Sequence, residues 1–590
     1  MNIRDICFAY FGWFGERLSG ILKGTEHDLD AAYMKVHPDV YFSYVGFAAF
    51  VSIGVIFFLS ILSFLGVFPL FDLLPFNKIM LIPIAAFLPI LVVLIGVIIP
   101  KTAASNRMAG LTIEIPYASM YISTMTSGGL SPFESFLRLG NMDLLPNMQN
   151  EVSRIETTVI SQGVDPVTAM EQAAKVVDIQ EYKELLLGYA STVRTGGDTL
   201  HYLFNQTDSM FNSLSTRIKG LGENMGMLME AYTIIGILGV LGLFLIYVVG
   251  AAMPTMGMGI TSEQFFLFSF VVLPMLSGVF IYFGDAAQIS YPVSNWKVYK
   301  IFVIFLPFGV LIGSQLVLPL FDNKFLFFPV FQDILFNLSS KLGLAEGTEA
   351  SLGLAITLII IAIPGVIADS YFIGREGKTV QGISHFLRDL VETRKSGLSP
   401  ERCIHALSER DYGAFSKYLK KISMKLNWGI PLRNIYEEFR EDMRNWLALI
   451  NIYLLIDTIE VGGGTEESLE TLAKFSESIK SLEDEKRAIL MPLTIVPFIG
   501  AALLTGTTVM FLQFFTSMGS LGVSIASVTL YKVLLTPLAL HSWVLGLVTG
   551  KITSGRVSAG FKFAILLTLV SVLGIWGVSN LSLGGSMVGM

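Results

Sequence analysis

The motif Gly129-Leu130-Ser131-Pro132 returns later in the chain as Gly397-Leu398-Ser399-Pro400, and this repetition determines the organisation of the protein. Two further glycine signals follow each copy in the same order. They are Gly163-Val164-Asp165-Pro166 matched by Gly429-Ile430-Pro431, and Gly196-Gly197-Asp198-Thr199 matched by Gly462-Gly463-Gly464-Thr465. The first glycine of each later signal stands at a nearly constant distance along the chain from its earlier counterpart. Three ordered matches at a nearly constant offset indicate an internal duplication.

Each glycine signal is expected to mark the point where one helix ends and the next begins. Glycine adopts the left-handed conformation that ends a helix, serine or aspartate caps the next helix, and proline such as Pro132 or Pro400 fits its first turn. Between the signals the apolar residues recur at helical spacing, as in Ile113, Tyr117 and Met120. Each copy therefore predicts a compact bundle of antiparallel helices. No strand pattern stands out, so we expect an all-α protein.

The composition of the rest of the chain is that of a membrane protein. Of its 590 residues, 53% are hydrophobic and only 15% are charged, and the mean hydropathy is +0.64. Soluble domains contain roughly 25% charged residues. The net charge of -7 argues against nucleic acid as a partner. The two cysteines, Cys7 and Cys403, are too few for a disulfide framework or a metal site.

Nine segments have the roughly 20 apolar residues that a spanning helix needs. They are 45–64, 79–99, 231–252, 265–283, 301–320, 352–371, 489–515, 524–549 and 561–578. The predicted organisation is an N-terminal segment, two spans, a first bundle, four spans, a second bundle, and three spans with a short tail. The corresponding ranges are 1–44, 45–99, 100–230, 231–371, 372–488 and 489–590.

The distribution of basic residues predicts the orientation. With a cytoplasmic N-terminus, 36 of the 40 lysines and arginines lie on the cytoplasmic side. The short connections decide the orientation, because long domains have little influence on it. The N-terminal segment and the loops 284–300 and 550–562 are rich in basic residues, and the short loops on the opposite side are not. We expect the protein to lie in the cell membrane, with both bundles in the cytoplasm and the C-terminus outside.

The N-terminal segment is not a secretory signal, since Arg4, Glu16, Arg17 and Lys23 interrupt its apolar residues. Its apolar residues recur at helical spacing, which predicts an amphipathic helix. Two placements are open: along the membrane surface, or packed on the protein's own cytoplasmic domains.

One surface of the second copy is a candidate docking site. Lys417, Lys420, Lys421 and Lys425 fall on one side of a predicted helix, opposite its apolar residues. An ordinary solvated face is one interpretation, and docking to an acidic protein or to anionic lipid headgroups is the other. The matching stretch of the first copy, near Glu151, has no such lysines, which favours specialisation of the second copy.

No residues of the chain form a recognisable catalytic or cofactor-binding pattern. Gly377-Lys378-Thr379 resembles the end of a phosphate-binding loop, but Phe372 stands where the first glycine is needed and an apolar span precedes it. His541 is the one ionisable residue deep in a span, and we expect a packed side chain. Asn337 and Asn580 begin glycosylation sequons on the predicted outer side. We expect no catalytic residue, no cofactor and no metal.

The ordered, duplicated glycine signals, each followed by a long apolar helix, resemble the type II secretion system F domain family. The number of spans is more similar to the archaeal members of that family than to the bacterial ones. This resemblance implies a platform protein of a type IV pilus-like machine, either an archaellum or an adhesive pilus. It also implies the partners: a hexameric secretion ATPase that the lysine stripe would contact, pilin-like subunits, membrane lipids and a second copy in a dimer.

Two other function classes remain as alternatives. A transporter or channel would place ionisable groups at the middle of the membrane and would repeat its spans. A membrane enzyme would need an acid–base or metal constellation near the interface.

Overall fold

The computed structural model describes residues 3–22, 24–34, 36–64, 81–252, 262–289, 291, 296–321, 326–518 and 527–586. Within these ranges the regular structure is helical and contains no strand, which confirms the all-α prediction. The chain divides into two compact units, Met1–Met210 and Phe211–Met590, and we describe each by itself.

In the first unit, the N-terminal helix α1 (Ile3–Ile21) packs on α3 (Pro38–Phe64), and the short helix α2 (Thr25–Ala31) connects them and packs on α4. The ring of Phe11 contacts those of Phe47 and Phe50, at centroid distances of 5.9 and 5.6 Å. Neither predicted placement describes this contact, because α1 packs on the helix that contains the first predicted span and not on a cytoplasmic domain. It still exposes Tyr10 and Trp13 on its outer side.

The first copy of the duplication is a bundle of six helices. They are the end of α4 (Leu81–Ser127), α5 (Pro132–Arg138), α6 (Pro146–Gln162), α7 (Pro166–Val176), α8 (Gln180–Thr195) and the start of α9 (Thr199–Ala252). A 3₁₀ turn, η3 (Leu139–Asn141), follows α5. The apolar stripe predicted around Ile113, Tyr117 and Met120 is buried.

The second copy repeats this order. Its helices are α15 (Gly374–Arg394), α16 (Pro400–Leu407), α17 (Ser416–Asn427), α18 (Leu432–Asp442), α19 (Trp446–Gly462) and α20 (Glu466–Leu490), with a 3₁₀ turn, η9 (Gly413–Phe415), between α16 and α17. The two copies therefore match helix for helix, although η3 directly follows α5 whereas η9 directly precedes α17.

The glycine signals lie at the helix junctions. Gly129, Gly163, Gly196, Gly397, Gly429 and Gly463 all have positive φ, which glycine adopts without strain. One assignment needs correction: Gly462 is the last residue of α19, and Gly463 is the left-handed C-cap. Gly463, rather than Gly462, is therefore the structural counterpart of Gly196. Gly197 does not have positive φ.

Side chains cap the helices that follow these glycines. Ser131 and Ser399 accept hydrogen bonds from the backbone N–H groups of Glu134 and Arg402, and Pro132 and Pro400 are the first helical residues. Equivalent capping serines in the two copies are the local reason that α5 and α16 start at the same place. The second junction differs, because Asp165 caps α7 whereas Pro431 offers α18 no side-chain cap.

Among the described residues, eight helices are long and apolar enough to cross a membrane, so this is a multi-pass membrane protein. They correspond to the second to ninth predicted spans. The first predicted span lies in α3, but the side chains of its second half are outside the described residues.

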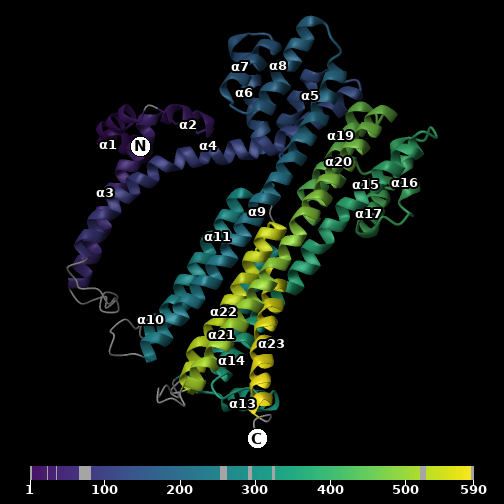
Figure 1. Ribbon diagram of the computed structural model, residues 1–590. Coiled ribbons are helices and arrows are strands. Elements are labelled where there is room, and N and C mark those ends of the chain that lie inside the picture. Colours follow the sequence, from purple (N-terminus) through teal and green to yellow (C-terminus); the bar gives the residue numbers. More distant parts are fainter. Residues whose placement is uncertain are drawn as a thin grey trace. The chain divides into compact units, whose positions relative to one another are not determined.

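No break separates the predicted bundles from the spans. The long helices α4 and α9 each contain both a span and a bundle helix (Figure 1). In the second copy, α14 (Glu349–Ala368) continues through a π-helical turn, η8 (Asp369–Ile373), into α15. Similarly, α20 continues through a 3₁₀ turn, η10 (Met491–Thr494), into α21 (Ile495–Met518), and Pro492 lies in that turn.

Candidate functional site

The candidate docking surface of the second bundle is the outer face of α17. Phe415, Leu419 and Ile422 anchor the other face, with 0%, 1% and 8% of their surfaces exposed. The apolar residues therefore fix the rotation of the helix about its axis. This rotation exposes Lys417 and Lys420, as the sequence predicts, whereas the side chain of Lys425 is only 12% exposed.

Two of the four predicted lysines are paired within the bundle. Lys421 lies 2.9 Å from a carboxylate oxygen of Asp442 and 3.7 Å from one of Glu438, and Lys425 pairs with Glu438. The hydrogen bond from Lys425 lowers the pKa of Glu438, and the one to Asp442 raises the pKa of Lys421. These two lysines thus hold α17 to α18 and are compensated in charge, a role that the sequence analysis missed.

The remaining outer face of α17 combines charge with apolar surface. Lys417 and Lys420 are exposed on it. Met424 and the C-cap residue Trp428 are 47% and 68% exposed. At 100° per residue both lie within about 20° of the direction of Lys417. Trp and Met are enriched at the centres of protein interfaces, so this face has the composition of a docking surface.

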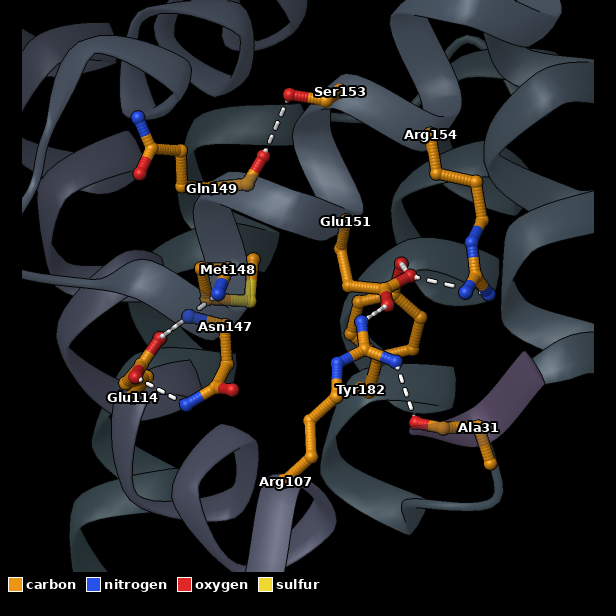
Figure 2. A network of polar contacts seen from close by, with 10 residues as sticks. All are labelled: Ala31, Arg107, Glu114, Asn147, Met148, Gln149, Glu151, Ser153, Arg154 and Tyr182. Atoms are coloured by element: carbon orange, nitrogen blue, oxygen red, sulfur yellow. Dashed lines mark hydrogen bonds and ion pairs between the residues drawn. The ribbon is translucent and has the colours of Figure 1, made fainter. Parts of the chain in front are cut away.

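The equivalent helix of the first copy, α6, is used for internal contacts. Glu151 of α6 is fully buried, and its carboxylate pairs with Arg107 of α4 and lies 3.6 Å from Arg154. The hydroxyl of Tyr182 donates to the same carboxylate at 3.2 Å. Figure 2 shows these four side chains converging from α4, α6 and α8. A buried charge is stable only when it is paired and hydrogen-bonded, and this one is.

This buried network also fixes the N-terminal segment to the first bundle. Arg107 donates a hydrogen bond of 2.7 Å to the carbonyl of Ala31, the last residue of α2 (Figure 2). A cation at a helix C-terminus is favourable because of the helix dipole. The guanidinium of Arg107 also lies 5.1 Å from the ring centroid of Tyr33, a non-glycine residue with φ of 57°. The N-terminal helices are thus held by a defined polar contact.

A second buried carboxylate lies nearby. Glu114 of α4 accepts hydrogen bonds from the backbone N–H groups of Asn147 and Met148 and from the side-chain amide of Asn147, at 2.7 to 2.9 Å (Figure 2). It caps the N-terminus of α6 from a neighbouring helix. Burial raises its pKa to about 7, although the hydrogen bonds oppose this shift.

The sequence did contain a signal for both carboxylates. Glu114 interrupts the apolar stripe of α4 between Ile113 and Tyr117, and Glu151 occupies a core position of α6. A charged residue on a buried face requires partners, but the sequence alone does not identify them.

The other residues considered from the sequence have structural environments. Gly377-Lys378-Thr379 lies inside α15 and forms no loop. His541 is 7% exposed, and its ring packs against Gly236, where a Cβ atom would lie 3.0 Å from it. In the sequon that starts at Asn337, Ser339 is buried in α13 (Pro329–Lys341), and Asn580 lies in α23 (Gly560–Ser586). In the described part of the chain, no group of three or more His, Cys, Asp or Glu residues is placed to hold a metal ion.

Comparison with known proteins supports the duplication. Residues 118–247 and 386–513 each match the family model described as "Type II secretion system (T2SS), protein F". An uncharacterized protein of Methanocaldococcus jannaschii is 20% identical over 512 residues, which cover 82% of each chain. No solved structure matches the chain.

Proposed function

The chain carries the type II secretion system protein F domain twice, and from this premise we propose that it is the membrane platform of an archaeal type IV pilus-like machine. In this role it couples a cytoplasmic secretion ATPase to the assembly of pilin-like subunits in an archaellum or an adhesive pilus. Its own residues carry out no catalysis. Membrane lipids surround the spans, and the hexameric ATPase supplies the energy.

The observation that carries this proposal is the continuity of the helices. The first and last helices of each bundle extend directly into spans, through α4 and α9 in one copy and through α14–α15 and α20–α21 in the other. A helix is stiff along its axis, so a displacement of a bundle by a cytoplasmic motor reaches the membrane segments without a flexible linker. An ATPase that moves a bundle thereby moves the helices beside which filament subunits would be inserted.

The outer face of α17 is the proposed contact for the ATPase. Because Lys421 and Lys425 are compensated by Glu438 and Asp442, the contact depends on Lys417 and Lys420 and on the apolar anchor of Met424 and Trp428. An acidic, partly apolar surface on the ATPase would complement this composition.

The test measures binding of the secretion ATPase to the full-length chain in lipid nanodiscs across a salt series. Each exposed charge contributes about 0.2–1 kcal/mol, so reversing both charges in Lys417→Glu/Lys420→Glu should weaken binding by about fivefold or more. Trp428→Ala should weaken it further, since buried tryptophans contribute about 2 kcal/mol or more.

Lys175→Glu/Lys183→Glu, which makes the same change of net charge on the first bundle, is the control and should leave the affinity unchanged. Unchanged affinity in both the lysine and the tryptophan variants would show that this face of α17 is only solvated surface.

One observation favours the transporter alternative, because the duplication includes the spans as well as the bundles. In the described part of the chain no three or more His, Cys, Asp or Glu residues gather as a metal site would require, and His541 packs against Gly236. The platform therefore remains the function that the observations favour.

A further inference from the structure

The duplication extends beyond the bundles into the membrane. Gly196 and Gly463 are equivalent residues, and we use the difference between their residue numbers to find other equivalent positions. Adding this difference to 262–287 gives 529–554. The first range contains α10 (Ser262–Leu267), η5 (Phe268–Val272) and α11 (Leu273–Ala287), and the second lies within α22 (Ser527–Ser554). The same shift, which we call the repeat offset, carries α12 (Lys297–Val317) into α23. Each copy is therefore one entering span, one bundle and three following spans.

Helices that are equivalent in the two copies also contact each other, and they do so at the repeat offset. A Cβ atom on Gly222 of α9 would lie 2.0 Å from Ile489 of α20, and one on Gly226 would lie 3.6 Å from Leu493. Further along, a Cβ atom on Gly500 of α21 would lie 2.5 Å from Thr233 of α9. In all three pairs the two members are separated along the chain by the same repeat offset as Gly196 and Gly463.

A second pair of equivalent helices behaves in the same way. A Cβ atom on Gly284 of α11 would lie 3.7 Å from the side chain of Lys551 of α22, and these two residues are again separated by the repeat offset. At this point Lys551 pairs with Asp285 and donates a hydrogen bond of 3.0 Å to the carbonyl of Gly555. Gln288 of the first copy donates to the carbonyls of Lys551 and Ile552 at 2.8 and 2.9 Å.

Residues that meet their own equivalents lie at a twofold axis, as in the isologous interface of a symmetric dimer. Two unrelated helices can pack in any register. In these four pairs, however, each residue contacts the residue at the equivalent position of the other copy, which indicates a symmetric arrangement. The helices of each pair run in the same direction along the chain, so the local axis is parallel to them. We call these contacts of α9 with α20–α21 and of α11 with α22 the central seam.

The central seam is no longer symmetric in its side chains. Small residues face large ones, as in Gly222 against Ile489 and Gly226 against Leu493. In a symmetric dimer of first copies Gly222 would face Gly222, and in a dimer of second copies Ile489 would face Ile489. Similarly, Asp285 and Lys551 attract each other, whereas two second copies would oppose Lys551 to Lys551. Steric and charge complementarity of this kind favours the unlike pair over either like pair.

We infer that the chain is a fused dimer, in which the second copy occupies at the central seam the place of a second chain. At the central seam each copy packs on the other copy of the same polypeptide, and this surface does not bind a second molecule. Self-association of the platform, if a dimer forms, uses a different surface. This inference rests on the duplication and the packing, and it is independent of the filament that the chain serves.

The first test uses cysteine pairs in the full-length chain, with Cys7 and Cys403 replaced by serine. Oxidation of Gly226→Cys/Leu493→Cys in membranes should form a disulfide within one chain, seen as loss of both thiols to a maleimide reagent at monomer mass. Each single cysteine variant should keep its thiol and form no covalent dimer. A covalent dimer of Gly226→Cys or of Leu493→Cys alone would place this surface between two molecules and overturn the inference.

The second test exchanges the charges at the seam. Asp285→Lys and Lys551→Asp, made singly, should each lower the unfolding temperature of the purified full-length chain, because like charges then meet. The double variant Asp285→Lys/Lys551→Asp again brings opposite charges together, so it should recover most of the loss. The exposed pair Arg388 and Glu477, on α15 and α20, is the control, and its single reversals should change the unfolding temperature little. A double seam variant no more stable than the worse single one would contradict charge complementarity across the central seam.

Discussion

Two buried carboxylates of the first bundle, Glu114 and Glu151, have different sources of stabilisation. Glu151 has two arginines and a tyrosine hydroxyl beside it, so its charge is compensated directly. Glu114 accepts its hydrogen bonds from the start of α6, and burial raises its pKa to about 7. Donors alone do not replace the solvation that a carboxylate loses on burial. The Glu151 carboxylate therefore organises a structural contact, whereas the raised pKa of Glu114 predicts a pH-dependent stability.

We predict that the stability of the protein falls as the pH rises from about 5 to 7, in part because of Glu114. The folded state retains its proton up to a pKa of about 7, whereas the unfolded chain releases it near the ordinary value of 4.5. The folded state thus binds more protons in this window, and stability decreases with pH. Glu114→Gln should flatten this dependence, measured as the unfolding temperature of the full-length chain between pH 5 and 8.

The exposed Glu156 on α6 provides the control, since Glu156→Gln should leave the slope unchanged. An unaltered slope in Glu114→Gln would mean that Glu114 is ionised throughout the range. A glutamine cannot accept all three hydrogen bonds, so the absolute stability of this variant should fall while its pH dependence disappears.

At the scale of elements, the last two helices show how the membrane part is packed. Gly546 and Gly550 of α22 face Ala564 and Gly560 of α23, and a Cβ atom on either glycine of α22 would lie 2.0 to 2.2 Å from the backbone of α23. Small residues at a spacing of four allow two helix backbones to approach closely in a membrane. Figure 1 shows α22 and α23 side by side along their length.

Gly550→Leu should therefore separate α22 from α23 and destabilise the protein by about 1–3 kcal/mol or more, the range that is typical of overpacking. Gly577 of α23 has no atom near the position of a Cβ, so Gly577→Leu makes the same chemical change without a clash. Thermal unfolding of the two variants in detergent is the measurement. Equal stability of the two would show that the close approach of the backbones is not required.

The helices were more predictable from the sequence than their contacts. Gly163 and Gly429 located helix ends because only glycine adopts a positive φ without strain. The rotation of α17 was predictable from Leu419 and Ile422, because burial of apolar residues fixes it. The pairing of Lys421 with acidic residues of α18 was not, since it depends on which helix packs beside α17. For the same reason the sequence did not reveal the partners of Glu151.

At the scale of the whole molecule, the duplication bears on topology. Each copy contributes an even number of spans: one that enters the bundle and three that follow it. A chain that crosses the membrane four times between equivalent points returns to the side from which it started. We therefore expect both bundles on the same side of the membrane, and the distribution of basic residues predicts that this side is the cytoplasm.

Accessibility of single cysteines in intact cells tests this topology, with Cys7 and Cys403 replaced by serine. We predict that Lys183→Cys in the first bundle and Lys417→Cys in the second react with an impermeant reagent only after the membrane is opened, because 36 of the 40 basic residues lie on the predicted cytoplasmic side. Asp333→Cys on the exposed side of α13 and Met590→Cys at the C-terminus should react in intact cells. Labelling of Lys183→Cys and Lys417→Cys from opposite sides would refute four crossings per copy. Protection of Met590→Cys alone would instead remove one of the three spans that follow the second bundle, and the two copies would then differ in their number of spans.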